Sequence, residues 1–161
     1  MIFVLAWHHN GHYWAQGPVD LYFLIEDDVS TQSWTGWYNA HEEWNEAQNS
    51  PTEFIFTENH YIDLITCEYG YSEVGWAGYT WFNPSSPGEI NYAGVMMNEY
   101  YTYYYPYYKR VAVAGHEFGH TLGLAHNSGQ YLMEPSAYMV YDVYGIYQPT
   151  STDVNEVNAL Y

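Results

Sequence analysis

The sequence predicts an α+β domain with a mixed sheet of about five strands, an N-terminal helix, a helix that carries a histidine motif and a C-terminal helix. Short runs rich in branched and aromatic residues, separated by turn residues, are typical of strands. One early segment instead repeats its large apolar side chains at helical spacing. With 161 residues, of which 48% are hydrophobic, the chain can bury the core of a single domain, which we expect to span residues 1–161.

The first strand is expected over residues 19–26 (VDLYFLIE), which lie between a Gly-Pro and an Asp-Asp pair. The first helix is expected from Trp34 to Ala47, because the large apolar residues fall on one helical face until an Asn-Ser-Pro sequence stops it. Four more strand-like runs follow, the last two around a Pro-Ser-Ser-Pro-Gly turn, and they cover residues 53–57, 61–69, 75–83 and 89–98.

Residues 100–108 (YYTYYYPYY) form the low-complexity segment of the chain. We interpret this segment as a surface loop that leads into the next helix. The alternative is a contact surface for substrate or for self-association, because tyrosine offers a large contact area at a small entropy cost.

Charge narrows the classes of partner. Nineteen acidic side chains face two basic ones, Lys109 and Arg110, for a formal net charge of -17. Nucleic acid and anionic membranes attract basic surfaces, so we expect neither as a partner. No run reaches the roughly 18 to 20 apolar residues of a membrane-spanning helix, and the opening residues lack the features of a signal peptide. We interpret the charge as adaptation to an extracellular setting, and we expect a secreted protein whose signal and prodomain are not present in this sequence.

The next helix is expected after Pro106, and it carries the sequence His-Glu-Phe-Gly-His at residues 116–120. His116 and His120 are four residues apart, so their side chains leave the same helical face and can bind one ion. Glu117 lies about 100° round the helix from His116, beside such an ion instead of on it. This H-E-x-x-H arrangement leaves the carboxylate free to act as a base.

Gly123 and His126 complete the pattern of a catalytic zinc site, which needs three protein ligands and a position open to water. A glycine three residues after the second ligand allows a positive φ, which ends the helix and turns the chain back toward the ion. The five specified positions of HEFGHTLGLAH give a chance match odds on the order of one in ten thousand or less. A core helix with three incidental histidines is one alternative, and a structural zinc site closed by a fourth protein ligand is another.

HEFGHTLGLAH resembles the metal-binding motif of the metzincin clan of metallopeptidases, and the chain looks most like matrixins and their prokaryotic relatives. The resemblance covers most of the chain and implies a zincin domain with an upper part over about residues 1–123 and a lower part over about 124–161. It also implies that Met133, seven residues past His126, forms an apolar floor beneath the imidazoles without binding the metal. Residues 152–161 resemble the matrixin C-terminal helix, with Thr152 in place of the first of two acidic residues.

The same resemblance implies where a substrate binds. Tyr138 follows the methionine turn one residue later than in the family's Pro-x-Tyr sequence, and we expect it, or Tyr141, in the wall of the main specificity pocket. The stretch over residues 68–89 holds neither His nor Asp, so we expect no second, structural zinc there. Three residues lie where the family has the edge strand that pairs with an extended peptide: Ala77, Gly78 and Tyr79.

The sequence therefore predicts a zinc-dependent endopeptidase that acts on protein or peptide substrates. Zinc lowers the pKa of its bound water toward about 7 and polarises the scissile carbonyl. Glu117 takes a proton from this water and passes it to the leaving amine. The alternative is a metzincin-like binding or assembly module with weak or no proteolysis. The tyrosine-rich segment supports that alternative, whereas the presence of Glu117 favours the enzyme.

The remaining histidines have simpler interpretations. His8, His9 and His12 are expected in a solvated arm, with adventitious metal binding as the alternative. His41 has asparagine, not histidine, four residues later, so it starts no second motif, and His60 is expected in a turn.

Two further features concern stability. Glu26, Asp27 and Asp28 match no calcium-loop pattern, so we expect a solvated acidic turn there, with structural Ca²⁺ as the alternative. Cys67 is the single cysteine, so no intrachain disulfide can form, and we interpret it as a small buried residue of a strand.

Overall fold

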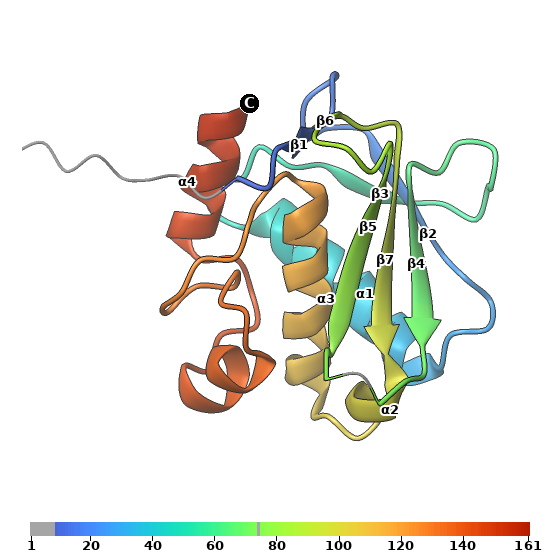
Figure 1. Cartoon of the computed structure of the whole chain (residues 1–161), viewed down its shortest axis with the longest axis vertical. Coiled ribbons are helices and arrows are strands. Elements are labelled where there is room, and N and C mark those ends of the chain that lie inside the picture. The colour runs from blue at the N-terminus through green and yellow to red at the C-terminus, as the bar shows by residue number, and fades with distance from the viewer. Residues whose placement is uncertain (1–8, 74) are drawn as a thin grey trace, which may run out of the picture.

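A five-stranded sheet is the frame of the fold in the computed structural model, which describes residues 9–73 and 75–161 (Figure 1). The strand order is β3-β2-β4-β7-β5, in which the first four strands are parallel and the edge strand β5 is antiparallel to β7. The strands are β2 (Leu21–Ile25), β3 (Phe54–Phe56), β4 (Ile65–Gly70), β5 (Gly78–Asn83) and β7 (Tyr92–Asn98). The predicted mixed sheet of five strands in an α+β fold is therefore confirmed.

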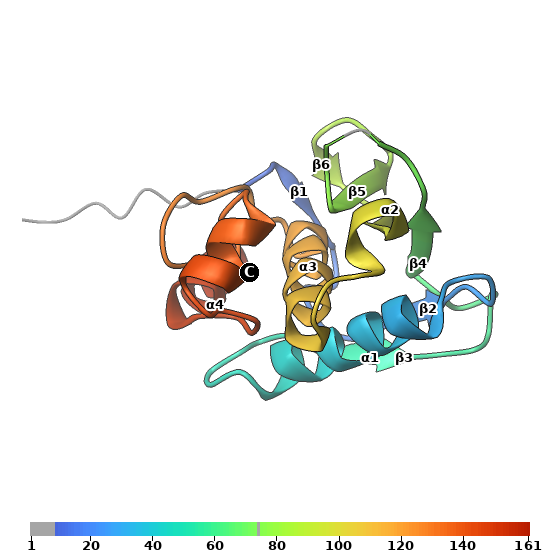
Figure 2. The same ribbon diagram turned by 90° about the horizontal axis from the view of Figure 1, so that it is seen from below.

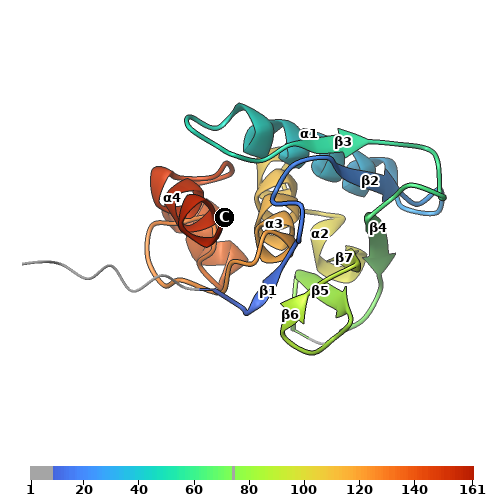
Figure 3. The ribbon, with the colours of Figure 1, turned by 90° about the horizontal axis from the view of Figure 1, so that it is seen from above.

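Two long helices, α1 (Thr31–Glu46) and α3 (Tyr107–Thr121), pack against each other and against the sheet. Figures 2 and 3, which view the molecule from below and from above, show α3 between the sheet and the C-terminal helix α4. None of the described helices has the length and apolar content that crossing a bilayer requires. The smaller elements are the parallel pair β1 (His12–Tyr13) and β6 (Gly88–Glu89), the short helix α2 (Glu99–Thr102), the π-helix η1 (Tyr138–Val143) and α4 (Ser151–Leu160).

Phe118 anchors α3 in the core. Its ring contacts Phe23 of β2, Trp37 of α1 and Phe54 of β3, with centroid separations of 5.5, 5.5 and 4.8 Å. All four side chains are almost fully buried. Burial of a large aromatic side chain contributes about 1.5–3 kcal/mol, so this cluster fixes the rotation of α3 and with it the direction of the residues on the opposite helical face.

Most element boundaries differ from the sequence prediction by a few residues. Helix α1 begins three residues before Trp34, because Ser30 caps it and its Oγ accepts a hydrogen bond from Ser33 N. Strand β4 begins at Ile65, so the predicted start at residue 61 was wrong. Asn59 accepts a hydrogen bond from Tyr61 N, and this bond closes a turn where the strand was expected. Cys67 lies fully buried in β4, as expected.

The tyrosine-rich segment is more ordered than a loop. Its first residues belong to α2, and α3 already begins at Tyr107, directly after Pro106, whose fixed φ suits a helix start. Between the two helices, Tyr103 and Tyr104 stack their rings edge to face and remain exposed. The predicted loop is thus a single turn between two helices.

Asp153 ties α4 to the rest of the molecule. Its buried carboxylate accepts hydrogen bonds from the backbone N–H groups of Leu132 and Met133 and from the N–H and hydroxyl of Thr150. The bond from the Thr150 N–H is one half of a capping box at the start of α4, and the other half is the bond from Asp153 N to Thr150 Oγ1. One acidic side chain therefore caps the C-terminal helix and holds the turn that contains Met133, without an acid at Thr152.

We expect Asp153→Ala to lower the free energy of unfolding by about 3 kcal/mol, because it leaves two buried N–H groups of the methionine turn without an acceptor. Urea unfolding followed by circular dichroism measures this change. Asn155→Ala, at an exposed position of the same helix, is the control and should cost less than about 1 kcal/mol. An equal decrease in the free energy of unfolding in the two variants would show that the hydrogen bonds of Asp153 do not stabilise the fold.

Candidate metal centre and cleft

Three histidine side chains converge on one point at the C-terminal half of α3. His116 and His120 leave the same face of the helix, and the chain then turns at Gly123, which has a φ of 90°, and returns His126 to them. One ring nitrogen from each imidazole lies within 4.8 Å of the others. Elsewhere in residues 9–73 and 75–161, no other three His, Cys, Asp or Glu side chains converge in this way.

Backbone carbonyls set the direction of two of these rings. His116 Nδ1 lies 2.8 Å from the carbonyl oxygen of Leu132, and His120 Nδ1 lies 2.8 Å from that of Leu124. A carbonyl can only accept, so each Nδ1 carries the proton and each Nε2 has a free lone pair. The Nε2 atoms of His120 and His126 approach to 3.2 Å. This is the donor set and the outer support that zinc requires, so the residues fit the metal.

The protonation states also suit a cation. Burial lowers the pKa of His116 well below its usual value and lowers the pKa of His120 to about 4. Burial also lowers the pKa of His126, while the Glu134 carboxylate opposes that shift. All three imidazoles are therefore neutral near pH 7 and can donate a lone pair to a metal without first losing a proton.

Glu117 lies beside the histidines, pressed against the edge strand. Its carboxylate is so close to Gly78 of β5 that a Cβ atom at that position would overlap it. Thr80 of the same strand donates a hydrogen bond from Oγ1 to Glu117 Oε2 at 2.6 Å. Burial raises the pKa of Glu117 to about 8, and the Thr80 hydrogen bond opposes the shift. The site thus contains a carboxylate that holds a proton far more readily than an exposed one.

Met133 is fully buried beneath the helix, where its sulfur lies directly against Gly119, between the two helical histidines. Its neighbour Leu132 supplies the carbonyl that orients His116. The methionine turn thus contacts both the backbone and a side chain of the metal-binding helix.

A cleft of about 570 Å³ runs between the edge strand and the segment that follows the histidines. Of the residues expected to bind substrate, Ala77, Gly78 and Tyr138 line it, and Tyr138 is largely exposed. Tyr79 does not line the cleft, because successive side chains of a strand alternate and Thr80 and Gly78 face α3 instead. Tyr141 also lies outside the lining.

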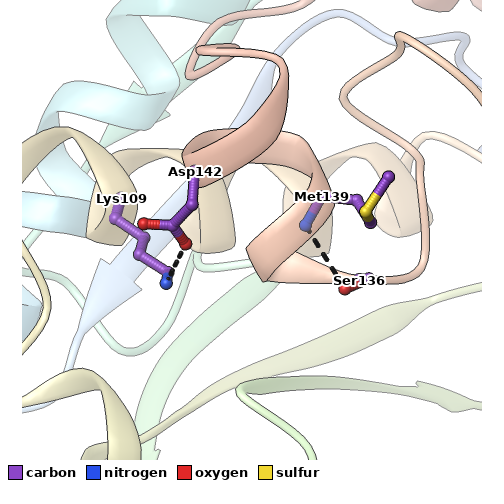
Figure 4. Close-up of polar contacts among 4 residues, drawn as sticks. All are labelled: Lys109, Ser136, Met139 and Asp142. Carbon is purple, nitrogen blue, oxygen red and sulfur yellow. Dashed lines mark hydrogen bonds and ion pairs between the residues drawn. The ribbon is translucent and has the colours of Figure 1, made fainter.

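The outer wall of the cleft is fixed by one of the two basic side chains (Figure 4). Lys109 of α3 forms an ion pair with Asp142 of η1, and its ammonium group also lies 4.2 Å from the centre of the Tyr105 ring, which lines the cleft. Ser136 Oγ accepts a hydrogen bond from Met139 N, in the first turn of η1, at 3.3 Å. These contacts place η1, and with it Tyr138, against α3.

The N-terminal arm, residues 9–14, is not solvated, which corrects the prediction for His9 and His12. His9 pairs with Leu124 in an isolated antiparallel bridge, and its Nε2 lies 3.0 Å from the carbonyl oxygen of Glu156. His12 is buried and stacks on the Phe82 ring at 4.0 Å. The arm is held because its aromatic and histidine side chains cover apolar surface. His8 lies outside the described residues.

The other predicted sites remain apart from the metal centre. Glu26, Asp27 and Asp28 directly follow β2, where Asp27 and Asp28 lie exposed in a turn, as expected of a solvated acidic turn. The alternative, structural Ca²⁺ at this turn, stays untested. His41 lies buried in α1 with its Nδ1 hydrogen-bonded to the Tyr38 carbonyl, and His60 lies in a turn, as expected.

Two residues at the site escaped the sequence interpretation. Thr80 bonds Glu117 from a neighbouring strand, and Asn10 bonds the turn after α3 from 110 residues away in sequence. The alternation of β5 could have suggested Thr80, since it lies two residues after Gly78 and therefore on the same face. Asn10 gives no signal in the sequence.

The buried Glu117 predicts a pH dependence in the metal-free protein. Its pKa is about 8 in the folded state, against a usual value of 4.5, so the folded state binds the extra proton and stability is lost as pH rises through this window. The histidines have lowered pKa values and act in the opposite sense, with stability lost as pH falls below 6.5. Relative to Glu117→Gln, wild-type stability should fall by up to about 1.4 kcal/mol per pH unit between pH 4.5 and 8. Thermal unfolding of both chelator-treated proteins across this range measures it, and parallel curves would contradict it.

Comparison with known proteins agrees with this geometry. A model of the matrixin family matches residues 35–161. No curated protein matches the chain. One similar solved structure is the GM1-bound form of the ECX AB5 holotoxin, in which a chain is 16% identical with a TM-score of 0.63, over 95% of this chain and 85% of that chain.

Another similar solved structure is high choriolytic enzyme 1, a hatching enzyme zinc-protease from the Medaka fish Oryzias latipes. It is 20% identical with a TM-score of 0.44, over 71% of this chain and 50% of that chain. The match to the family model covers most of the sequence, including both helical histidines, the methionine turn and α4. The chain belongs to the matrixin family.

Proposed function

We propose that this protein is a zinc-dependent endopeptidase, in which His116, His120 and His126 hold the metal and Glu117 is the catalytic base. One observation carries the proposal: three neutral imidazoles converge beside a buried carboxylate, and His116, His126 and Glu117 line the same cleft beneath an edge strand. A purely structural zinc site would instead be closed by a fourth protein ligand. His126 is exposed, and among residues 9–73 and 75–161 no fourth His, Cys, Asp or Glu side chain joins the convergent group.

The edge strand β5 offers a place for an extended peptide. Its outer side is the edge of the five-stranded sheet, so a substrate chain can add to it through main-chain hydrogen bonds. Ala77 and Gly78 lie where this strand borders the cleft, directly above Glu117. The peptide bond of a chain bound there would lie between the strand and the histidines, with one side chain directed toward Tyr138.

Bound zinc would polarise the scissile carbonyl and make a water molecule more acidic. Glu117 accepts the proton of the attacking water and then passes it to the leaving nitrogen. Burial strengthens this carboxylate as a base, and Thr80 holds one oxygen so that the other can face the water. The carbonyls of Leu132 and Leu124 keep the imidazole rings fixed while the charge of the substrate changes.

Location and partners complete the proposal. A shortage of basic side chains, with two against nineteen acidic ones, favours a secreted enzyme that acts on proteins or peptides and not on nucleic acid or membranes. The alternative, a binding or assembly module with the same fold, draws its support from the exposed tyrosines around Tyr103, Tyr104, Tyr107 and Tyr108.

Glu117→Gln should lower kcat for hydrolysis of an unfolded protein by at least about 100-fold, because the amide cannot accept the proton of the attacking water. The zinc content of the variant, measured by atomic absorption, should stay at one ion per chain. The change keeps the size of the side chain, so Gly78 and Thr80 can retain their contacts. Undiminished turnover in this variant would reject the mechanism, and a wild-type protein that binds zinc but cleaves nothing would favour the module.

A further inference from the structure

The N-terminal arm lies against the turn that joins the second and third histidines. In Figures 1 and 3, β1 passes beside the C-terminal end of α3, where the chain leaves the helix. Asn10 N donates to the carbonyl oxygen of Gly123 at 2.8 Å. Gly123 packs so tightly that an added Cβ would lie 2.6 Å from the His12 carbonyl oxygen. The arm is therefore in direct contact with the backbone of the turn.

The arm supplies donors that the helix end lacks. The last carbonyls of an α-helix have no partner within the helix. Here Trp14 donates from Nε1 to the Thr121 carbonyl at 2.8 Å, and Asn10 donates from Nδ2 to the His120 carbonyl at 2.9 Å. Gly123 N adds a second bond to the same His120 carbonyl at 3.0 Å. Side chains from the arm thus complete the end of α3 where the metal-binding helix stops.

A second bond from Asn10 reaches the carbonyl that orients His120. Asn10 Nδ2 also donates to the Leu124 carbonyl at 3.1 Å, and this same oxygen lies 2.8 Å from His120 Nδ1. The amide orientation is determined, because Asn10 Oδ1 accepts from His12 N at 2.9 Å while its nitrogen faces two carbonyls. One side chain therefore spans the turn from His120 to Leu124 and holds the oxygen that His120 uses.

We propose that Asn10 is a positioning residue of the metal centre, which fixes the turn after α3 so that His120 and His126 face the same ion. The inference rests on the proposed zinc site. Without the amide, the Leu124 carbonyl is free to rotate toward solvent, and His120 loses the acceptor that sets its tautomer and direction. His126 lies only two residues past Leu124, so the same motion displaces the third ligand.

Zinc affinity tests the proposal. The metal-free wild type and Asn10→Ala are titrated with zinc in the presence of a chelating dye of known affinity. We expect the Kd for zinc to rise about 10- to 100-fold in the variant, the usual effect of losing an outer partner of a metal-bound histidine. Circular dichroism of both metal-free proteins at the assay temperature shows whether each is folded.

Two further variants separate positioning from general stability. Asn45→Ala removes an amide that makes two similar bonds to the backbone of Phe54, between α1 and β3 and away from the turn. It should lower Tm but leave the Kd for zinc within about twofold of wild type. Asn10→Asp keeps the acceptor for His12 N and loses the donor, so it should weaken zinc binding at least as much as Asn10→Ala.

Each possible result of these titrations either supports or overturns the proposed role of Asn10. An unchanged Kd in Asn10→Ala, with a loss of Tm like that of Asn45→Ala, would make Asn10 a structural residue only and overturn the proposal. Wild-type affinity in Asn10→Asp would do the same, since no donor would then be needed. If Asn10→Ala does not fold at the assay temperature, Asn10→Asp provides the decisive titration. A wild type that binds no zinc would reject the proposed function itself, and this inference with it.

Discussion

Two backbone carbonyls, those of Leu132 and Leu124, determine whether three imidazoles can share one ion. Each accepts a hydrogen bond from a helical histidine and so turns the opposite ring nitrogen inward. Apart from these histidines, each of the two residues is also held by a side chain from outside the helix. Asp153 of α4 binds the N–H of Leu132, and Asn10 of the N-terminal arm binds the oxygen of Leu124. The N-terminal arm and α4 therefore each support one histidine of the candidate metal centre.

Electrostatics at the site depends on burial. A chain with a formal net charge of -17 has little positive field of its own to stabilise a carboxylate. Glu117 is nevertheless 5% exposed and sits beside imidazoles that burial keeps neutral. In the absence of metal this arrangement favours a protonated Glu117 and makes an ionised carboxylate costly. A cation at the histidines would relieve this cost, so metal binding would stabilise the folded state.

Features that follow from the spacing of residues along the chain could be predicted from the sequence. Contacts with backbone groups far away in the sequence could not. The spacing of His116, His120 and His126 follows from helical geometry and one glycine, so the convergence of their rings could be expected. The five-stranded sheet followed from runs of branched and aromatic residues between turn residues. By contrast, the start of β4 depended on a local side-chain turn at Asn59. The N-terminal arm was misjudged because its binding surface, the carbonyls of a turn more than a hundred residues away, has no sequence pattern.

The two basic side chains, Lys109 and Arg110, both contact residues beside the cleft. Lys109 is 9% exposed and bridges Asp142 of η1 and the ring of Tyr105, while Arg110 donates to the Tyr105 carbonyl. Both therefore contact Tyr105, which lines the cleft, but neither of them lines the cleft itself. Breaking an ion pair with one buried partner costs more folding free energy than breaking an exposed pair, because solvent does not reach the charge that remains. The position of η1, and hence the shape of the pocket beside Tyr138, thus depends on an ion pair made by one of the two basic side chains in a chain with nineteen acidic ones.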